Sequence, residues 1–351
     1  MLPHEYATMT EEEACNRIRA AKVALGPDLV ILAHHYQRDS VVQFGDFVGD
    51  SLELSQRTAE ARQARYIVFC GVDFMAETAA MLCGPEQQVL IPEKAARCPM
   101  AAMANSQQAV VAWNSLTSLW GDDITPITYQ NSYADVKAFC GKRGGAVCTS
   151  ANAQKVMRWA FSQRGHVMFF PDEHLGRNSG HALGIPDSRI QVWDPDNPAP
   201  DAMRDASLVV WKGFCNVHTR FTVQHVEAIR KQYPGVKIVV HPECPAEVVA
   251  RADANGSTSY IIRYVNSLPD GATVAIGTEI HMVERLARLN PGKTVVPLAR
   301  SQCAAMYRIN PQNLAYALDQ LTEGRVVNRV QVPCEVQKWA NLALERMLAL
   351  A

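Results

Sequence analysis

Three cysteines occupy matching places in this sequence, each in a loop that follows an apolar run with the pattern of a β-strand. The three segments read "IPEKAARC", "VVWKGFC" and "VVPLARSQC", and they end at Cys98, Cys215 and Cys303. Cysteine thiolates bind soft metal ions and iron–sulfur clusters. A single such cysteine would most simply be a buried thiol, because unpaired cysteine is among the most frequently buried residue types. Three cysteines at equivalent places favour one shared metal site.

The spacing of the cysteines bears on the kind of metal. Structural zinc normally takes four ligands and uses close pairs such as C-x₂-C, and none of the ten cysteines forms such a pair. Three thiolates can hold a [4Fe–4S] cluster while one iron is left without a protein ligand. That iron can bind a hydroxyl or carboxylate and act as a Lewis acid, which suits dehydration chemistry.

Polar side chains gather where the strand-like runs end. Three hydroxyl positions precede or open predicted helices, where a hydroxyl and free backbone N–H groups bind anions. Each alone would be read as a helix cap, but their matching places favour a pocket for phosphate or carboxylates. Glu243 beside His241 is a candidate general base. The candidate residues are His34, Tyr36, Ser51, Tyr129, Asn131, Ser150, His218, His241, Glu243, Ser257 and Thr258.

These side chains need elements to position them, and short β-branched runs alternate with amphipathic stretches, as is typical of parallel α/β proteins. Strands are expected at 29–35, 65–71, 88–93, 123–131, 166–172, 207–213, 236–243, 272–279 and 293–299. Helices with a polar face are expected at 50–64, 132–142, 153–163, 221–232 and 282–289.

The elements fall into three blocks of similar plan. Each block opens with a strand that ends in polar residues ("LAHHYQ", "TYQNSYA", "VHPECPA") and continues with a segment before a helix ("FCGVDFMAETA", "VCTSANA", "NGSTSYII"). A third strand then ends in an acid ("LIPEK", "FFPDE", "AIGTE"), and in the first block it leads directly to Cys98. Ligands of open parallel sheets bind beyond the carboxyl ends of the strands. Three such blocks about a pseudo-three-fold axis would bring three sets of strand ends together.

The composition is that of an ordinary globular protein. Of 351 residues, 48% are apolar, and the formal net charge is −1, so there is no basic excess to bind a nucleic-acid backbone. No apolar stretch approaches the roughly 20 residues that cross a bilayer, and the acidic N-terminal segment lacks the apolar run of a secretory signal. We expect a cytoplasmic protein with neither nucleic-acid nor membrane partners.

At these residues the sequence resembles the quinolinate synthase family, the iron–sulfur enzymes of NAD biosynthesis. The resemblance runs from about residue 30 to residue 310 and rests on the order and number of short motifs. They are "LAHHYQ", "GDSLELS", "FCGVDFMAETA", "CPMAAM", "YQNSYADVKA", "VCTSANA", "FPDEHLG", "WKGFCNVH", "HPECPAEV", "GSTSYII", "IGTE" and "CAAM".

The resemblance implies three homologous three-layer α/β/α domains with parallel sheets, arranged as a pseudo-three-fold triangle with the active site at its centre. The first domain is expected at 1–110, with the C-terminal helices of 311–351 packed on it. The second is expected at 111–222, with a Pro- and Asp-rich surface insert near 177–207, and the third at 223–310.

The resemblance also implies a transferase that condenses iminoaspartate with dihydroxyacetone phosphate to give quinolinate, phosphate and two waters. Cys98, Cys215 and Cys303 would hold a [4Fe–4S] cluster. Tyr36, Tyr129 and Glu243 would take part in proton transfer and carbonyl chemistry, and His218 would line the site. An aspartate-oxidising enzyme would supply the unstable iminoaspartate. The residues implied to hold the phosphate and carboxylates are His34, Ser51, Tyr129, Asn131, Ser150, His241, Glu243, Ser257 and Thr258.

The remaining cysteines are given no ligand role. Some family members carry closely spaced cysteines at the third ligand position, whereas this sequence has Cys303 alone, which argues against a disulfide switch there. Cys148 and Cys244 adjoin site motifs and are interpreted as non-ligands. The cysteines interpreted as structural are Cys15, Cys70, Cys83, Cys140 and Cys334.

Three other functions remain open at this point. A [4Fe–4S]-dependent hydro-lyase acting on a small hydroxy acid would use the same open iron without a phosphate pocket. A non-catalytic iron–sulfur sensor would need no substrate pocket, so the repeated anion-binding positions argue against it. An aldolase that uses Lys94, Lys137 or Lys212 would leave the three cysteines unexplained.

Overall fold

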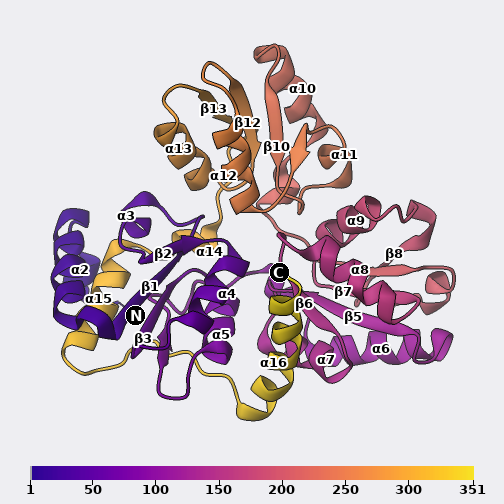
Figure 1. Cartoon of the computed structure of the whole chain (residues 1–351), viewed down its shortest axis with the longest axis horizontal. Coiled ribbons are helices and arrows are strands. Elements are labelled where there is room, and N and C mark those ends of the chain that lie inside the picture. Colours follow the sequence, from indigo (N-terminus) through magenta and orange to yellow (C-terminus); the bar gives the residue numbers. More distant parts are fainter. Residues whose placement is uncertain (1) are drawn as a thin grey trace. The chain divides into compact units, whose positions relative to one another are not determined.

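Residues 2–351, which the computed structural model describes, form three parallel β-sheets flanked by helices (Figure 1). The first sheet has the strand order β2-β1-β3-β4, the second β6-β5-β7-β9-β8 and the third β11-β10-β12-β13. All pairs of neighbouring strands are parallel. The parallel α/β class expected from the sequence is confirmed.

The strand bounds are as follows. The first sheet contains β1 (Leu29–His34), β2 (Phe47–Gly49), β3 (Tyr66–Cys70) and β4 (Gln88–Leu90). The second contains β5 (Ile124–Tyr129), β6 (Ala146–Cys148), β7 (His166–Phe170), β8 (Ile190–Trp193) and β9 (Leu208–Trp211). The third contains β10 (Lys237–Val240), β11 (Ala254–Asn255), β12 (Thr273–Gly277) and β13 (Thr294–Pro297).

The three sheets repeat one topology. In each, the first strand lies between a short second strand at the edge and the third strand. The place beside the third strand, here called the fourth, is taken by β4, β9 or β13, and β8 is an added strand outside β9. The middle of the first block was wrongly aligned: its third strand is β3, and "LIPEK" belongs to the fourth strand, β4. The cause is β2, whose three residues are too short to show a hydrophobic period, so the following strands were each counted one place too early.

The insert expected near 177–207 adds a strand to the second sheet. Strand β8 pairs in parallel with β9 at the sheet edge, and its terminal residues Ile190 and Trp193 are buried. The stretch is therefore partly a surface loop and partly an extension of the sheet, because its two apolar ends pack inward.

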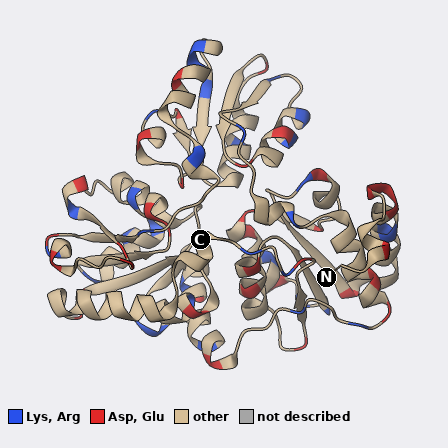
Figure 2. Ribbon diagram, turned by 180° about the vertical axis from the view of Figure 1, so that it is seen from behind, with Lys and Arg blue, Asp and Glu red and all other residues tan. Residues whose placement is uncertain are grey.

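Burial on both faces explains the strand composition. Every residue of β3 and of β5 is buried, as expected for parallel strands covered by helices on both sides. Most of the longer helices begin at side-chain caps, such as Thr10, which forms a reciprocal capping box with Glu13. Figure 2 shows acidic and basic residues interspersed on the helices.

Contacts divide the chain into two compact units. The first extends to Cys98 and includes Gln302–Val332, and the second consists of Pro99–Ser301 and Pro333–Ala351. The helices of the first unit are α1 (His4–Ala7), α2 (Glu11–Leu25), α3 (Asp39–Val42), α4 (Ser51–Glu60), α5 (Asp73–Leu82), α14 (Ala304–Tyr307) and α15 (Pro311–Thr322). Those of the second are α6 (Ser106–Trp120), α7 (Ala134–Lys142), α8 (Ala153–Gln163), α9 (Glu173–Ala182), α10 (Val223–Gln232), α11 (Ala246–Val249), α12 (Thr258–Ser267), α13 (Ile280–Leu289) and α16 (Cys334–Ala349).

The two C-terminal helices belong to different units. Helix α15 packs on α2, as expected for the first domain, but α16 packs on α7 and β6 of the second unit. Gly141 on α7 permits this close approach, because a Cβ there would lie 1.9 Å from the carbonyl oxygen of Trp339. The expected location of 311–351 on the first domain therefore does not hold for α16. The domain boundaries at 110, 222 and 310, and the triangular arrangement, stay predictions.

No helix within residues 2–351 is long and apolar enough to cross a membrane.

Candidate active site

The predicted serines occupy one equivalent position in the three sheets. Ser51, Ser150 and Ser257 are each the second residue after the edge strand, β2, β6 or β11. The sequence indicated that the three serines hold matching places, but it did not predict the short strands that precede them. Their side chains lie at the carboxyl ends of parallel strands, where such sheets bind ligands.

Of the three serines, Ser257 alone caps a helix with its side chain. Its hydroxyl accepts a hydrogen bond from the backbone N–H of Tyr260 at 3.3 Å, at the start of α12. At the start of α4 the cap is Asp50, whose carboxylate accepts hydrogen bonds from two backbone N–H groups, and Ser51 is the first helical residue. Ser150 lies in the turn before α8.

Besides Glu243, whose Oε1 has no hydrogen-bond partner among residues 2–351, two predicted binding residues carry such a buried oxygen. They are Oγ1 of Thr258, the first residue of α12, and Oδ1 of Asn131, which lies two residues after β5. A buried polar atom without a partner is costly, so native proteins rarely keep one unless a ligand or water satisfies it. Both atoms therefore mark positions for a polar ligand.

The first strands of the repeats also end in predicted site residues. His34 ends β1 and is 5% exposed, and its Nδ1 accepts a hydrogen bond from the backbone N–H of Tyr36 at 3.1 Å. The two rings meet edge to face, with centroids 4.8 Å apart. Tyr129 ends β5 and is buried. The structure places all three residues at strand ends, as the sequence predicted.

Glu243, His218 and His241 form a buried trio in the second unit. Oε2 of Glu243 lies 2.6 Å from Nδ1 of His218 and 3.2 Å from Nδ1 of His241. The two imidazoles stack with centroids 4.4 Å apart, and all three residues are at most 3% exposed. Nε2 of His218 lies 3.1 Å from the hydroxyl oxygen of Thr278, which follows β12.

The trio holds Glu243 as a carboxylate. Burial alone would raise the pKa of Glu243, but the nearby imidazoles of His218 and His241 outweigh it and hold this pKa well below its usual range. Burial, with His241 nearby, lowers the pKa of His218, so its ring is neutral near pH 7 and can donate from Nδ1 to the carboxylate. An ionised carboxylate fixed by two histidines is available to accept a proton or a hydrogen bond from a bound substrate, and its low pKa makes it a weak base.

Cys215 lies beside this trio. Its carbonyl accepts a hydrogen bond from the backbone N–H of His218 at 3.1 Å. One ligand atom from each of Cys215, His218 and Glu243 lies within 4.8 Å of the others, a spacing that permits metal binding. The thiol of Cys215 therefore lies next to Glu243, the candidate general base.

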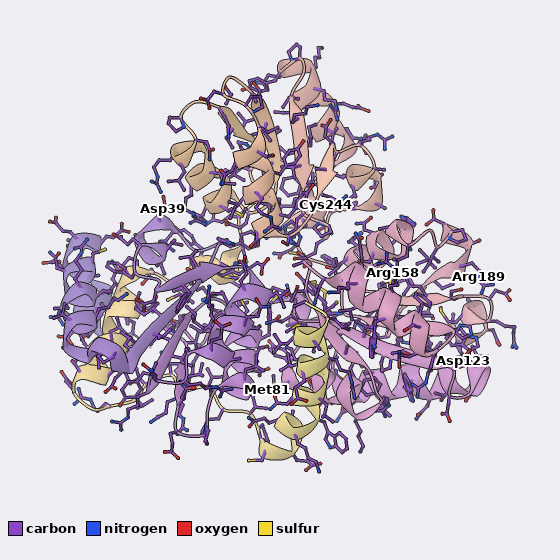
Figure 3. The ribbon with its side chains drawn as sticks, in the orientation of Figure 1. Asp39, Met81, Asp123, Arg158, Arg189 and Cys244 are labelled. Atoms are coloured by element: carbon purple, nitrogen blue, oxygen red, sulfur yellow. The ribbon has the colours of Figure 1, made fainter. Side chains whose placement is uncertain are left out.

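The cysteines differ in burial: Cys83 is also partly exposed and Cys334 is exposed, so partial exposure alone does not single out the predicted ligands. Cys98, Cys215 and Cys303 are partly exposed, and each follows the fourth strand of its sheet, β4, β9 or β13. Burial raises the pKa of Cys70 to about 12 and raises the pKa of the other fully buried thiols as well. A metal ligand must be a thiolate, so the partly exposed trio fits a cluster better than the buried thiols do. The fully buried thiols are those of Cys70, Cys140, Cys148 and Cys244, and Cys244 is labelled in Figure 3.

Sequence reasoning missed three residues around the trio. Asp172 is fully buried and caps α9, and Thr278 bonds to His218. Asn178 contacts the loop that carries Glu243. The motifs "FPDE" and "IGTE" indicated acids at strand ends, but only the fold shows that Asp172 and Thr278 lie beside the trio.

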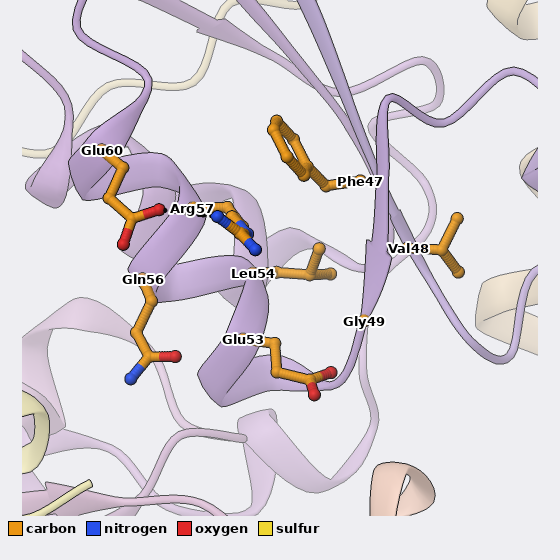
Figure 4. A pocket seen from close by; sticks show the side chains of 8 residues that line it. All are labelled: Phe47, Val48, Gly49, Glu53, Leu54, Gln56, Arg57 and Glu60. Atoms are coloured by element: carbon orange, nitrogen blue, oxygen red, sulfur yellow. Dashed lines mark hydrogen bonds and ion pairs between the residues drawn. The ribbon is translucent and has the colours of Figure 1, made fainter. Parts of the chain in front are cut away.

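A pocket of about 410 Å³ lies elsewhere, between β2 and α4 of the first unit (Figure 4). Its wall includes the exposed Phe47 and an ion pair between Arg57 and Glu60 at 2.9 Å. None of the predicted site residues lines it, and its mixed charges give it no preference for an anion.

Comparisons with known proteins agree with the motifs. A family model described as quinolinate synthetase A protein matches residues 16–349. The quinolinate synthase of Acidobacterium capsulatum is 48% identical, over 98% of this chain and 95% of that protein. Those of Corynebacterium glutamicum and of Bacillus cereus (strain AH187) are each 46% identical, over 100% and 99% of this chain and 91% and 96% of those proteins. A solved diphosphate reductase of Plasmodium falciparum covers 88% of this chain and 93% of its own, with a TM-score of 0.32 and 11% identity, too little to carry an argument.

Proposed function

The chain belongs to the quinolinate synthase family, and on that premise we propose that it condenses iminoaspartate with dihydroxyacetone phosphate. The products are quinolinate, phosphate and two waters, so the enzyme is a transferase of NAD biosynthesis. The observation that carries the proposal is the buried carboxylate of Glu243, held by two histidines beside Cys215.

The proposed cofactor is a [4Fe–4S] cluster held by Cys98, Cys215 and Cys303. Support comes from their matching places after the fourth strands and from their partial exposure. When bound, such a cluster supplies one iron without a protein ligand, which acts as a Lewis acid towards a hydroxyl or carboxylate.

The proposed substrate pocket holds one phosphate and the two carboxylates of iminoaspartate. The unpartnered oxygens of Asn131 and Thr258 and the hydroxyl of Ser257 at the start of α12 support this assignment. Phosphate fits a helix N-terminus because the N–H groups there point outward and carry partial positive charge. The other proposed binding residues are His34, Ser51, Tyr129, Ser150, His241 and Glu243.

Proton transfer is assigned to the trio and to two tyrosines. Joining the two substrates through a carbon–carbon bond and an imine requires protons to leave carbon and nitrogen and to reach departing oxygens. Glu243 is ionised and takes such a proton. His218 then stabilises the protonated Glu243 through the 2.6 Å contact. Tyr36 and Tyr129 are the proposed proton donors to carbonyl or hydroxyl oxygens.

The proposal also covers the source of iminoaspartate and the compartment in which the enzyme works. An aspartate-oxidising enzyme is the proposed source of iminoaspartate, which hydrolyses in water. The proposed compartment is the cytoplasm, because its reducing conditions keep cysteine thiols available as metal ligands.

An anaerobic assay with iminoaspartate and dihydroxyacetone phosphate tests the function. We expect quinolinate and phosphate to appear in equal amounts. A chain loaded with about four irons that forms no quinolinate, yet dehydrates a small hydroxy acid, would favour the hydro-lyase instead.

A further inference from the structure

The side chain of Asn178 joins helix α9 to the loop that carries Glu243. Its Nδ2 donates hydrogen bonds to the carbonyl oxygens of Pro242 and Cys244, both at 2.8 Å. These carbonyls belong to the residues on either side of Glu243, and Asn178 is 8% exposed. One buried amide therefore holds both flanks of the residue that contacts the two histidines.

Helix α9 is a firm support for this amide. Gly176, two residues before Asn178, lets the helix lie close against the second sheet, because a Cβ there would be 2.7 Å from Cγ1 of Val210. The N-terminus of α9 is fixed by Asp172, whose carboxylate accepts a hydrogen bond from the backbone N–H of Leu175 at 2.7 Å. The amide of Asn178 is thus held by a packed helix rather than by a loop.

The Glu243 loop depends on such support. Glu243 lies between the end of β10 at Val240 and the start of α11 at Ala246, outside the hydrogen-bond ladder of the sheet. Its carboxylate must meet two rings at 2.6 and 3.2 Å, and a shift of the backbone by 1 Å would break one or both contacts.

We propose that Asn178 is a positioning residue, which fixes the backbone at Glu243 so that its carboxylate meets His218 and His241. Asparagine suits this task because its side-chain amide offers two N–H donors on a short stem. Aspartate would offer none, and alanine would leave two buried carbonyls without this donor. The consequence for turnover rests on the proposed role of Glu243 as the proton acceptor.

The test compares Asn178→Ala and Asn178→Ser with a matched control, Gln87→Ala. Gln87 is also 8% exposed, and its Nε2 likewise donates to two carbonyls, those of Ala61 and Ala64, at 2.6 Å each. It lies just before β4, away from the carboxyl ends of the strands. Both alanine variants therefore lose the same kind of bridge, but only one of the two bridges supports Glu243.

In the cluster-loaded enzyme, we expect Asn178→Ala to lower kcat by about tenfold to a hundredfold, with KM for dihydroxyacetone phosphate changed by less than about twofold. Asn178→Ser keeps one donor and should recover part of kcat, while Gln87→Ala keeps the wild-type kcat. An Asn178→Ala enzyme with wild-type kcat, or equal losses in Asn178→Ala and Gln87→Ala, would overturn the inference.

A crystal structure of Asn178→Ala gives a readout that does not depend on activity. We expect the segment from Pro242 to Cys244 to move and the contact between Glu243 and His218 to lengthen. An unmoved segment would overturn the positioning role while the proposed function stands. A wild-type enzyme that forms no quinolinate would overturn the function, and the displacement in the crystal would still decide the positioning role.

Discussion

Nδ1 of His218 lies 2.6 Å from Oε2 of Glu243, and neither side chain is more than 3% exposed. His218 follows the fourth strand of the second sheet, and Glu243 follows the first strand of the third sheet. The contact therefore joins residues from two of the repeated blocks. In so buried a place, a carboxylate is retained only where hydrogen-bond donors compensate for its lost hydration.

Replacing Glu243 by glutamine tests its role as a proton acceptor. Glutamine has almost the same shape and retains hydrogen-bonding groups, but it cannot take up a proton near neutral pH. We expect Glu243→Gln to retain about four irons per chain and to lose about 10²- to 10⁴-fold in kcat, the usual contribution of general base catalysis. Steady-state kinetics with iron quantitation make the measurement, and an unchanged kcat would remove Glu243 from proton transfer.

Thr278 orients His218 through the ring nitrogen that faces away from Glu243, with 3.1 Å between Nε2 and the hydroxyl oxygen. Thr278→Val keeps the shape and removes the hydroxyl, so we expect kcat to fall by about 2- to 10-fold, the equivalent of one hydrogen bond. Thr278→Ser restores the hydroxyl and should restore most of kcat. If the valine and serine variants have the same kcat, the hydroxyl does not orient His218.

The cluster assignment predicts two classes of cysteine variant. Cys98→Ala, Cys215→Ala and Cys303→Ala should each lose most of the bound iron and the brown colour, because each removes one of three ligands. Cys83→Ala is the matched control: Cys83 is partly exposed like the three ligands but does not follow a fourth strand. It should keep about four irons per chain. Full activity in any of the three ligand variants would contradict the assignment.

Asp172 makes the stability of the fold depend on pH. Burial, with the charge of Glu243 nearby, raises the pKa of Asp172 well above its ordinary value of 3.8. Between 3.8 and the raised pKa the folded chain keeps a proton that the unfolded chain releases, so Asp172 lowers the free energy of unfolding as the pH rises. The slope reaches about 1.4 kcal/mol per pH unit, and it vanishes below both pKa values.

The variant Asp172→Asn removes this titration and keeps an oxygen that caps α9 well. The melting temperature of the variant should exceed that of the wild type by a margin that grows as the pH rises from 3.8 towards the raised pKa of Asp172. Thermal unfolding under anaerobic conditions at several pH values measures the margin. A margin that stays constant with pH would mean that Asp172 does not hold a proton in the folded chain.

The sequence predicted the long buried strands and missed the short ones at the sheet edges. Strands β1, β3, β5 and β7 are buried along nearly all of their length, as is typical of parallel strands covered on both faces. The unpredicted strands β2, β6, β8 and β11 have between two and four residues and all lie at edges. Their pairing is set by neighbouring strands, because so few residues carry no period of their own.

The residues of the candidate site were likewise predicted only in part from the sequence. Repetition along the chain indicated the three cysteines and the three serines, because each recurs at one place in the topology. His218 and Glu243 were found through motifs, but their contact was not, since they come from different blocks. Asp172 and Thr278 lie in motifs that indicated only acids at strand ends, and Asn178 had no recognisable signal. Each acts through a partner that only the fold brings near.

Activity measured against cluster content tests the central claim most directly. Apoprotein is reconstituted anaerobically to graded iron contents, from none to about four per chain, and quinolinate formation from iminoaspartate and dihydroxyacetone phosphate is followed at each content. We predict that the rate is zero without iron and rises in proportion to the loaded cluster. Quinolinate formed by the iron-free chain, or none formed at full loading, would contradict the account.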